Sequence, residues 1–236
     1  MKGLFRNISL ISASSVKTSF SVHYKDMEQL AKLLGGTERV KIMRLFLHHK
    51  DVVLSVKETI EKSKSNAIIV RKEIALLLGI GFLEKKKNRT YSTLGKGKHA
   101  KSIIKEVIGY KLNEEFLHNQ ALKDLLFDFE TVNRKDLANR FKSIGRIKLF
   151  IVSGIFLGQK DSRIDVLIVG ESLKRPKGEK IFEALAAELG RELLYTIMDV
   201  EEYTYRLKMY DKFVRDIIDM PHEKVLDKLN KKTTSE

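Results

Sequence analysis

The pattern of hydrophobic and polar positions between residues 55 and 94 predicts two short helices followed by a two-stranded hairpin. Ser55 stands three residues before Glu58, a spacing at which the two residues can cap a helix start by exchanging side-chain-to-backbone hydrogen bonds. A polar turn follows this first helix, and Ser65 is placed to cap the second one. One side of the second helix is apolar, because apolar residues recur there at spacings of three and four. These residues are Val70, Ile74 and Leu77.

The outer side of the second predicted helix and the hairpin carry polar and charged residues. We expect Asn66, Arg71 and Lys72 to face water near the start of that helix, and side chains of these types can reach base edges and phosphates. Gly81 is expected to end the helix, as a glycine after the last turn commonly does. The hairpin over 82–94 is then closed by a charged loop. The loop residues are Lys85, Lys86, Lys87, Asn88 and Arg89.

The order helix, turn, helix and two-stranded wing resembles the winged helix-turn-helix domains of prokaryotic transcriptional regulators. The likeness extends over residues 27–113 and is carried by the stretch 73–83, Glu-Ile-Ala-Leu-Leu-Leu-Gly-Ile-Gly-Phe-Leu, which cations follow. It implies that the second helix enters the major groove of double-stranded DNA and that the wing holds the phosphate backbone. Without the resemblance, the same residues describe only a small helical corner. The DNA-binding residues that we predict are Ser65, Asn66, Arg71, Lys72, Lys85, Lys86, Lys87 and Arg89.

The charge of the chain is concentrated in this same half. The formal net charge is +14, and residues 1–110 hold 22 Lys and Arg against 9 Asp and Glu. Residues 85–105 include eight cations and no carboxylate. Such a run favours a polyanionic partner, because neutralised phosphates release their condensed counterions. The alternative is a solvated surface without a partner, and we favour DNA because the run coincides with the predicted wing.

The rest of the amino-terminal half gives weaker signals. Residues 1–26 form an extension that suits a flexible arm, a strand exchanged between subunits, or translation begun upstream of the natural start. Residues 100–110 are expected to form a helix whose apolar side makes a dimer contact or packs within the chain. An amphipathic helix over 116–129 is expected to join the two halves across a connecting segment, 114–131. The apolar side of the helix over 100–110 consists of Ile103, Ile104, Val107 and Ile108.

Helical and strand patterns alternate in the second half, which predicts an α/β domain over 132–236. The whole chain is therefore expected to have an α/β fold with two domains, the first over 27–113. We predict that Asn133 caps the first helix of the second domain. The predicted strands are 147–152, 164–169 and 193–198, and the predicted helices are 133–143, 177–189, 200–209 and 212–220.

The stretch 151–170, Ile-Val-Ser-Gly-Ile-Phe-Leu-Gly-Gln-Lys-Asp-Ser-Arg-Ile-Asp-Val-Leu-Ile-Val-Gly, resembles the core of the minimal nucleotidyltransferase superfamily, with the likeness extending over 119–229. In that family a glycine-serine turn holds the nucleotide phosphates, and two carboxylates on the next strand bind magnesium. The carboxylates are two residues apart, so that they point to the same face of the strand and can share one hard cation.

This chain departs from the family pattern at the residues that catalysis needs. Arg163 takes the place of the first carboxylate, and Asp165 is the one that remains. An arginine there puts a fixed positive charge in the space of the metal ion, and it can pair with Asp165. The glycine-serine pair is changed to Ser153 and Gly154, and Asp161 in the preceding loop is two residues out of place. We therefore predict a degenerate nucleotidyltransferase fold without catalytic residues, metal or cofactor.

Together these patterns predict a cytoplasmic, homodimeric DNA-binding transcription regulator. The second domain is expected either to pair the subunits or to hold a small anionic or nucleotide effector near Ser153, Gly154, Arg163 and Lys160. The alternatives are a nucleotidyltransferase that acts on a protein or RNA, and an antitoxin or adaptor whose second domain binds a partner protein. No membrane span is expected, because no apolar run approaches the roughly 20 residues that cross a bilayer. DNA is favoured over an anionic membrane surface, because the cations do not lie opposite a strong apolar face. The chain has no cysteine, which excludes disulfides and thiolate metal sites.

Overall fold

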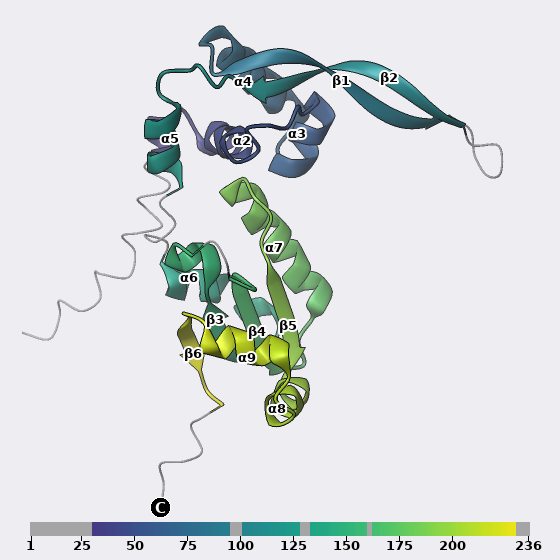
Figure 1. Ribbon diagram of the computed structural model, residues 1–236. Coiled ribbons are helices and arrows are strands. Elements are labelled where there is room, and N and C mark those ends of the chain that lie inside the picture. Colours follow the sequence, from purple (N-terminus) through teal and green to yellow (C-terminus); the bar gives the residue numbers. More distant parts are fainter. Residues whose placement is uncertain (1–29, 95–100, 128–132, 160–161, 230–236) are drawn as a thin grey trace, which may run out of the picture.

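The chain has a mixed α/β fold, seen in the computed structural model in Figure 1. The structure describes residues 30–94, 101–127, 133–159 and 162–229, with backbone alone for 88–94 and 101–105. The elements of the amino-terminal part are α2 (Thr37–His48), α3 (Val56–Ser63), α4 (Ala67–Gly79), β1 (Leu83–Leu94), β2 (Lys101–Leu112) and α5 (Asn119–Leu126). Those of the carboxyl-terminal part are α6 (Arg134–Arg140), η3 (Lys142–Ile144), β3 (Arg146–Val152), η4 (Gly154–Leu157), β4 (Val166–Glu171), α7 (Arg175–Leu189), β5 (Tyr195–Asp199), α8 (Val200–Lys208), α9 (Lys212–Asp219) and β6 (Glu223–Asp227).

Local sequence signals set the ends of α3 and α4. The predicted capping box is confirmed, because Ser55 Oγ accepts the Glu58 N–H at 3.2 Å and Glu58 Oε2 accepts the Ser55 N–H at 2.7 Å. The predicted glycine after α4 is confirmed as well, with Gly81 at φ +78°. The N–H groups of Gly81 and Phe82 donate to carbonyl oxygens of the last turn at 3.0 and 2.9 Å. This pair of hydrogen bonds closes the helix in the manner typical of a left-handed glycine.

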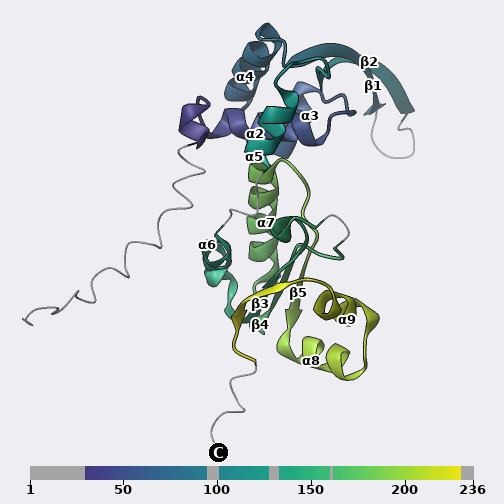
Figure 2. The same cartoon turned by 60° about the vertical axis from the view of Figure 1, so that its left-hand side comes forward.

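The two-stranded ribbon is longer than the sequence pattern predicts. β1 runs straight through the residues in which we expect a hairpin loop, and it pairs antiparallel with β2 from Leu83 opposite Leu112 to Leu94 opposite Lys101. Each strand has twelve residues, which at about 3.3 Å per residue makes a ribbon roughly 40 Å long. It projects well away from the helices (Figures 1 and 2). At its base, the backbones of Leu54 and Tyr110 pair through two hydrogen bonds of 2.9 and 2.8 Å.

The prediction of a helix over 100–110 is therefore wrong, since these residues belong mostly to β2. The apolar residues come in two adjacent pairs four residues apart, a spacing that also fits one side of a helix. They are, however, all β-branched, which favours a strand. Of the predicted helix over 116–129, residues 119–126 form α5. Residues 30–33 are helical, and the extension 1–26 lies outside the described residues.

A four-stranded sheet organises the carboxyl-terminal part. Its strand order is β5-β4-β3-β6, with β4 parallel to β5 and β3 antiparallel to both of its neighbours. Alternate residues of β3 point to opposite faces, so Phe150 packs with the hydrophobic cluster of α6 and α7, whereas Leu149 packs with that of α8 and α9. The alternation of helices and strands is confirmed. β6 is not predicted, because its short pattern lies directly behind the turn at Pro221.

The bounds of several predicted elements of this part differ from those expected. Asn133 caps α6 as predicted, and its side-chain oxygen accepts the N–H of Lys135 at 3.0 Å, but the helix ends at Arg140. The second strand starts at Val166 rather than at residue 164. The third strand extends to Asp199, one residue beyond the predicted end.

One buried cation joins the two parts. The side chain of Arg44 on α2 is 4% exposed. Its Nε donates to the carbonyl of Leu126, the last residue of α5, at 2.8 Å, and a terminal nitrogen donates to the carbonyl of Glu188 in the last turn of α7 at 3.0 Å. Arg44 thus caps the carboxyl ends of two helices, where carbonyls lack partners within the helix and the helix dipole is negative.

The close fit at this junction depends on Gly190, the residue after α7. It has φ +71°, and a Cβ at this position would lie 2.6 Å from the Arg44 Cβ. Burial lowers the pKa of Arg44 to about 10, so the guanidinium remains charged at neutral pH. In the described part of the chain, no helix combines the length and the apolar run required to cross a bilayer.

Candidate nucleic-acid interface

The helix α4 has one side in the core and the opposite side in water. Val70, Ile74 and Leu77 are buried. With 3.6 residues per turn, the side directly opposite carries Ile68, Lys72, Ala75 and Gly79, which are all exposed. Ala75 and Gly79 are small, so a partner can approach the helix backbone closely along this side.

The predicted cations of α4 both lie at the surface. Arg71 and Lys72 are exposed, and the only hydrogen bond that Arg71 makes with the described residues runs from its guanidinium to the Ala67 carbonyl, at 3.4 Å. Ile68 lies one turn before Lys72 and is 76% exposed. Ile68 is not among the predicted DNA-binding residues, because an isoleucine in an apolar stretch is typical of a core. A helical wheel centred on the buried side places it outside.

Two residues at the start of α4 differ from the prediction. Asn66, not Ser65, caps the helix, and its side-chain oxygen accepts the Ile68 N–H at 2.8 Å. Ser65 is 8% exposed, and its hydroxyl donates to the carboxylate of Glu38 on α2. The prediction that Ser65 contacts DNA is therefore corrected, because its hydroxyl is used within the chain. Asn66 itself is exposed.

A buried ion pair fixes how α4 sits on α2. Glu73 is 6% exposed, and its carboxylate accepts a hydrogen bond from Arg39 Nε at 2.6 Å. Arg39 also donates to the Leu34 carbonyl at 3.1 Å. The pair links residues 34 positions apart in the chain, and no short sequence motif marks it. It holds α4 in the rotation that turns Arg71 and Lys72 outward.

The ribbon adds exposed cations beside α4. Lys85, Lys86 and Lys87 are exposed and lie within β1, not in a loop. Two of them form surface ion pairs, Lys86 with Glu84 at 3.1 Å and Lys87 with Glu106 at 3.8 Å. Exposed pairs of this kind contribute little, so the lysines can exchange these partners for phosphates. Arg89 lies in the same strand, opposite Glu106 in the register.

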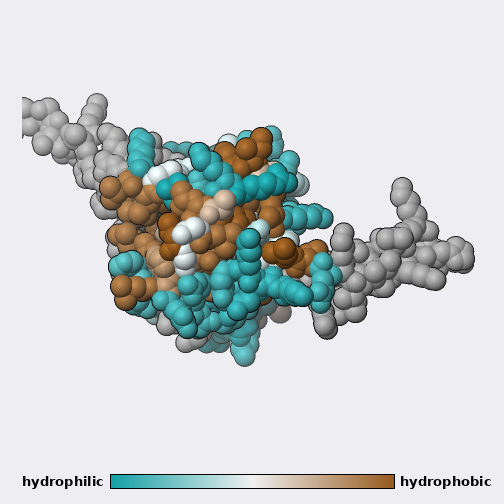
Figure 3. All heavy atoms as spheres, turned by 90° about the horizontal axis from the view of Figure 1, so that it is seen from above, coloured by the Kyte–Doolittle hydropathy of each residue, from teal (hydrophilic) through white to brown (hydrophobic). Residues whose placement is uncertain are grey.

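Apolar side chains gather on the face of the molecule that carries α4. In Figure 3 this face shows apolar groups with polar side chains among and around them. Its exposed apolar residues on α4 and next to it include Ile68, Ile69 and Ile80, at 76, 39 and 54% exposure. The outer side of α4 is thus a mixed surface, with apolar and cationic groups side by side.

The carboxyl-terminal candidate site is built differently, because backbone groups surround Asp165. The residue is 4% exposed. One carboxylate oxygen accepts the Ile155 N–H at 3.0 Å and the other accepts the Leu194 N–H at 2.9 Å. Its own carbonyl accepts the Ser153 N–H at 2.9 Å. Asp165 therefore ties the turn after β3 to the segment before β5, and its two oxygens are occupied by the chain itself.

The other residues of this site also have partners within the chain. Ser153 is 3% exposed, and its hydroxyl donates to the Pro221 carbonyl at 2.9 Å. Arg163 pairs with Asp216 on α9 at 2.7 Å. The predicted pairing of Arg163 with Asp165 is therefore wrong, because Asp165 points into the interior while Arg163 stays at the surface. Lys160 and Asp161 lie outside the described residues.

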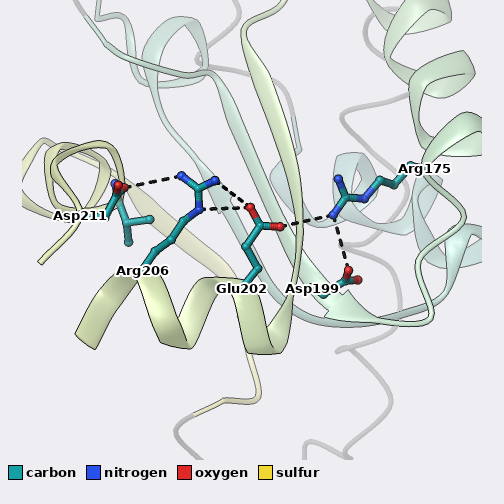
Figure 4. A network of polar contacts seen from close by, with 6 residues as sticks. Arg175, Asp199, Glu202, Arg206 and Asp211 are labelled. Atoms are coloured by element: carbon teal, nitrogen blue, oxygen red, sulfur yellow. Dashed lines mark hydrogen bonds and ion pairs between the residues drawn. The ribbon is translucent and has the colours of Figure 1, made fainter. Parts of the chain in front are cut away.

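Asp199 is the acidic residue that ends β5, and it is far from Asp165. In the parallel pairing of β4 with β5, Asp199 is opposite Gly170, whereas Asp165 precedes the other end of β4. Figure 4 shows Asp199 in a surface network around Arg175. The Arg175 guanidinium contacts Asp199 at 3.5 Å, and it also contacts Glu202 at 3.4 Å. Arg206 extends the network from Glu202, at 2.9 Å, to Asp211, at 3.8 Å. Asp199 thus pairs at the opposite end of the sheet and does not add a ligand beside Asp165.

Among the described residues, no group of three or more His, Asp or Glu side chains is arranged to hold a metal ion. Comparisons of the chain with protein-family models, with curated proteins and with solved structures give no match. The function is therefore inferred from the geometry of the chain itself.

Proposed function

We propose that the chain is a sequence-specific DNA-binding transcription regulator. In this proposal α2, α3, α4 and the ribbon form a winged helix-turn-helix domain, and the carboxyl-terminal part is a nucleotidyltransferase-like domain without catalysis. α4 enters the major groove and the β1–β2 ribbon follows the phosphate backbone.

The observation that carries the proposal is the position of α4 and the ribbon on one side of the molecule, away from the carboxyl-terminal part (Figures 1 and 2). The outer side of α4 offers Arg71 and Lys72, which suit guanine acceptors, and Ile68, which suits a thymine methyl group. The ribbon adds three exposed cations, with Lys85 and Lys87 on one face of β1 and Lys86 on the other. Base contacts and backbone contacts can therefore be made together, as specific binding requires.

A structural role for the carboxyl-terminal part is supported by the bonding of Asp165, Ser153 and Arg163. We propose that this part pairs two copies of the chain, so that the two α4 helices meet half-sites one DNA turn, or roughly 34 Å, apart. Light scattering coupled to size-exclusion chromatography tests the pairing, and a monomer over the whole concentration range contradicts it.

The main test is selection of bound fragments from genomic DNA of the native host, at about 50 and 200 mM salt. We expect fragments that share a sequence at both salt concentrations, with less DNA recovered at the higher one. The Arg71→Ala variant should recover fragments with a weakened shared sequence. The matched control is Lys177→Ala, an exposed cation on α7, which should leave the sequence unchanged.

Two outcomes would contradict the proposal. Fragments without any shared sequence would show that α4 does not read bases. Transfer of label from nucleoside triphosphates with magnesium, lost in Asp165→Asn but kept in Asp199→Asn, would show that the carboxyl-terminal part is catalytic.

A further inference from the structure

A basic cleft of about 520 Å³ lies between α6 and the edge of the sheet formed by β3 and β6. Its floor is partly exposed apolar surface from Ile147, Val225 and Leu226. Cations from three separate segments surround this floor. They are Lys135, Lys142, Arg146, Lys148 and Lys228.

The positive charge of the cleft is only partly balanced. Among the described residues that line it, none is acidic. Glu171 on β4 contacts Lys148 at 3.0 Å and Arg146 at 3.7 Å. The hydrogen bond from Lys148 holds the pKa of Glu171 below its usual value, so this carboxylate is charged at neutral pH. Lys142 and Lys228 on the rim are exposed and form no ion pair with the described residues, and a cleft with walls of a single sign concentrates the opposite charge.

The cleft is separate from the residues around Asp165. Its lining includes residues 145–148, which lie at the start of β3, whereas Ser153 follows the end of that strand. It is also separate from α4 and the ribbon, because every residue that lines it belongs to the carboxyl-terminal part.

We propose that this cleft binds an organic phosphate: a small molecule whose phosphate group contacts the lysines of the rim and whose apolar or planar body lies on the floor. The volume falls within the roughly 300–1,000 Å³ of small-molecule sites. The combination of a charged rim with an apolar floor selects such a molecule over inorganic phosphate, which leaves the floor in water, and over an uncharged ring, which offers the rim lysines no negative charge.

The test uses 1-naphthyl phosphate, with 1-naphthol and inorganic phosphate as partial probes. The chain has no tryptophan, so naphthyl fluorescence can be followed without interference from indole. We expect naphthyl phosphate to bind the full-length chain with one-to-one stoichiometry and more tightly than either partial probe. The double variant Lys142→Gln with Lys228→Gln should raise its Kd by about tenfold or more, since charge-assisted hydrogen bonds to phosphate are the strong ones.

A charge-matched variant separates a site from general attraction. Lys208→Gln with Lys212→Gln removes two exposed cations from α8 and α9 and should leave the Kd within about twofold, a change of well under 1 kcal/mol. Equal loss in both double variants, failure of the probe to saturate, or equally tight binding of 1-naphthol would each overturn the proposal.

The inference does not depend on DNA binding, and the two can fail separately. The cleft variant should bind duplex DNA as the unchanged chain does. If it weakens DNA binding as much as removal of the ribbon lysines does, the cleft belongs to a DNA-binding surface and the small-ligand proposal is wrong.

Discussion

In the amino-terminal part, Arg71 and Lys72 are exposed on α4, whose opposite side is buried, and Lys85 is exposed on the ribbon, whereas in the carboxyl-terminal part Asp165 and Ser153 are buried and bonded to backbone groups. Both sets of residues lie in stretches that resemble functional motifs. The difference lies in what their polar atoms already contact. A polar side chain that is exposed to solvent can bind a partner, whereas one that is hydrogen-bonded within the chain stabilises the fold.

The buried cation between the two parts gives the largest expected effect. Arg44→Met removes the cap of α5 and α7 and should lower the free energy of unfolding by about 3 kcal/mol, because charge-assisted hydrogen bonds to buried carbonyls are lost. Urea unfolding measures this change. Arg140→Met is the control, because Arg140 contacts the carboxylate of the same residue, Glu188, at 2.8 Å but is 29% exposed. That variant should cost under about 1 kcal/mol, and an equal loss in both would show that the buried cap is not special.

Asp165 should behave as a structural residue. Asp165→Ala leaves the N–H groups of Ile155 and Leu194 without their partner and should cost about 2 kcal/mol of unfolding free energy, with the DNA affinity of the folded protein unchanged. Asp165→Asn keeps one acceptor and should cost less. The matched change is Asp199→Ala, whose carboxylate is 56% exposed and whose loss should cost under about 1 kcal/mol. A stable Asp165→Ala variant would contradict the structural role.

Removal of the ribbon cations tests whether the exposed lysines of β1 contact DNA phosphates. The triple variant Lys85→Gln, Lys86→Gln and Lys87→Gln should weaken binding to all DNA sequences alike and flatten the slope of log K against log salt by about 0.9 per phosphate contact. Fluorescence anisotropy over a salt series gives the slope. The control triple is Lys177→Gln, Lys180→Gln and Lys208→Gln, three exposed cations of α7 and α8. An equal change in slope would mean that net charge alone, not the ribbon, attracts DNA.

Substitutions on α4 should change sequence choice instead. Arg71→Ala should cost about 1–3 kcal/mol of discrimination at one base position and leave the salt slope nearly unchanged. Ile68→Ser should reduce the preference for thymine at a neighbouring position, because it removes an apolar contact to the methyl group. Competition binding with single-base variants of the selected site measures both. Identical behaviour of the α4 and ribbon variants would show that these roles are wrongly assigned.

The smallest expected effect is a dependence of stability on pH at the junction. Partial burial, Arg191, His49 and Lys123 lower the pKa of His48 from 6.5 to about 4. The unfolded chain therefore binds a proton at this residue more readily, so the contribution of neutral His48 is complete above pH 6.5 and is lost as the pH falls toward 4. His48→Gln should flatten the pH dependence of the urea midpoint in this window. His222→Gln, away from the junction, should leave it unchanged.

Local signals explain which elements the sequence could predict. The capping box at Ser55, the glycine at residue 81 and the alternation of helices and strands are properties of short stretches, and the structure confirms them. The ribbon shows the limit of such signals. Residues 100–110 fit a helical spacing, and only the twelve paired positions across β1 and β2 make them a strand, because strand pairing is settled by contacts distant in the chain.

By itself the sequence determined the α/β class, most of the helix ends, the concentration of positive charge and the absence of thiol chemistry. Only the tertiary structure decided that Ser65 is buried, that Arg163 pairs with Asp216 rather than Asp165, and that Arg44 caps two helices. The first set follows from neighbouring residues and composition. The second depends on partners from 27 to 144 residues away in the chain. Which polar side chains form hydrogen bonds within the chain is therefore decided by tertiary contacts.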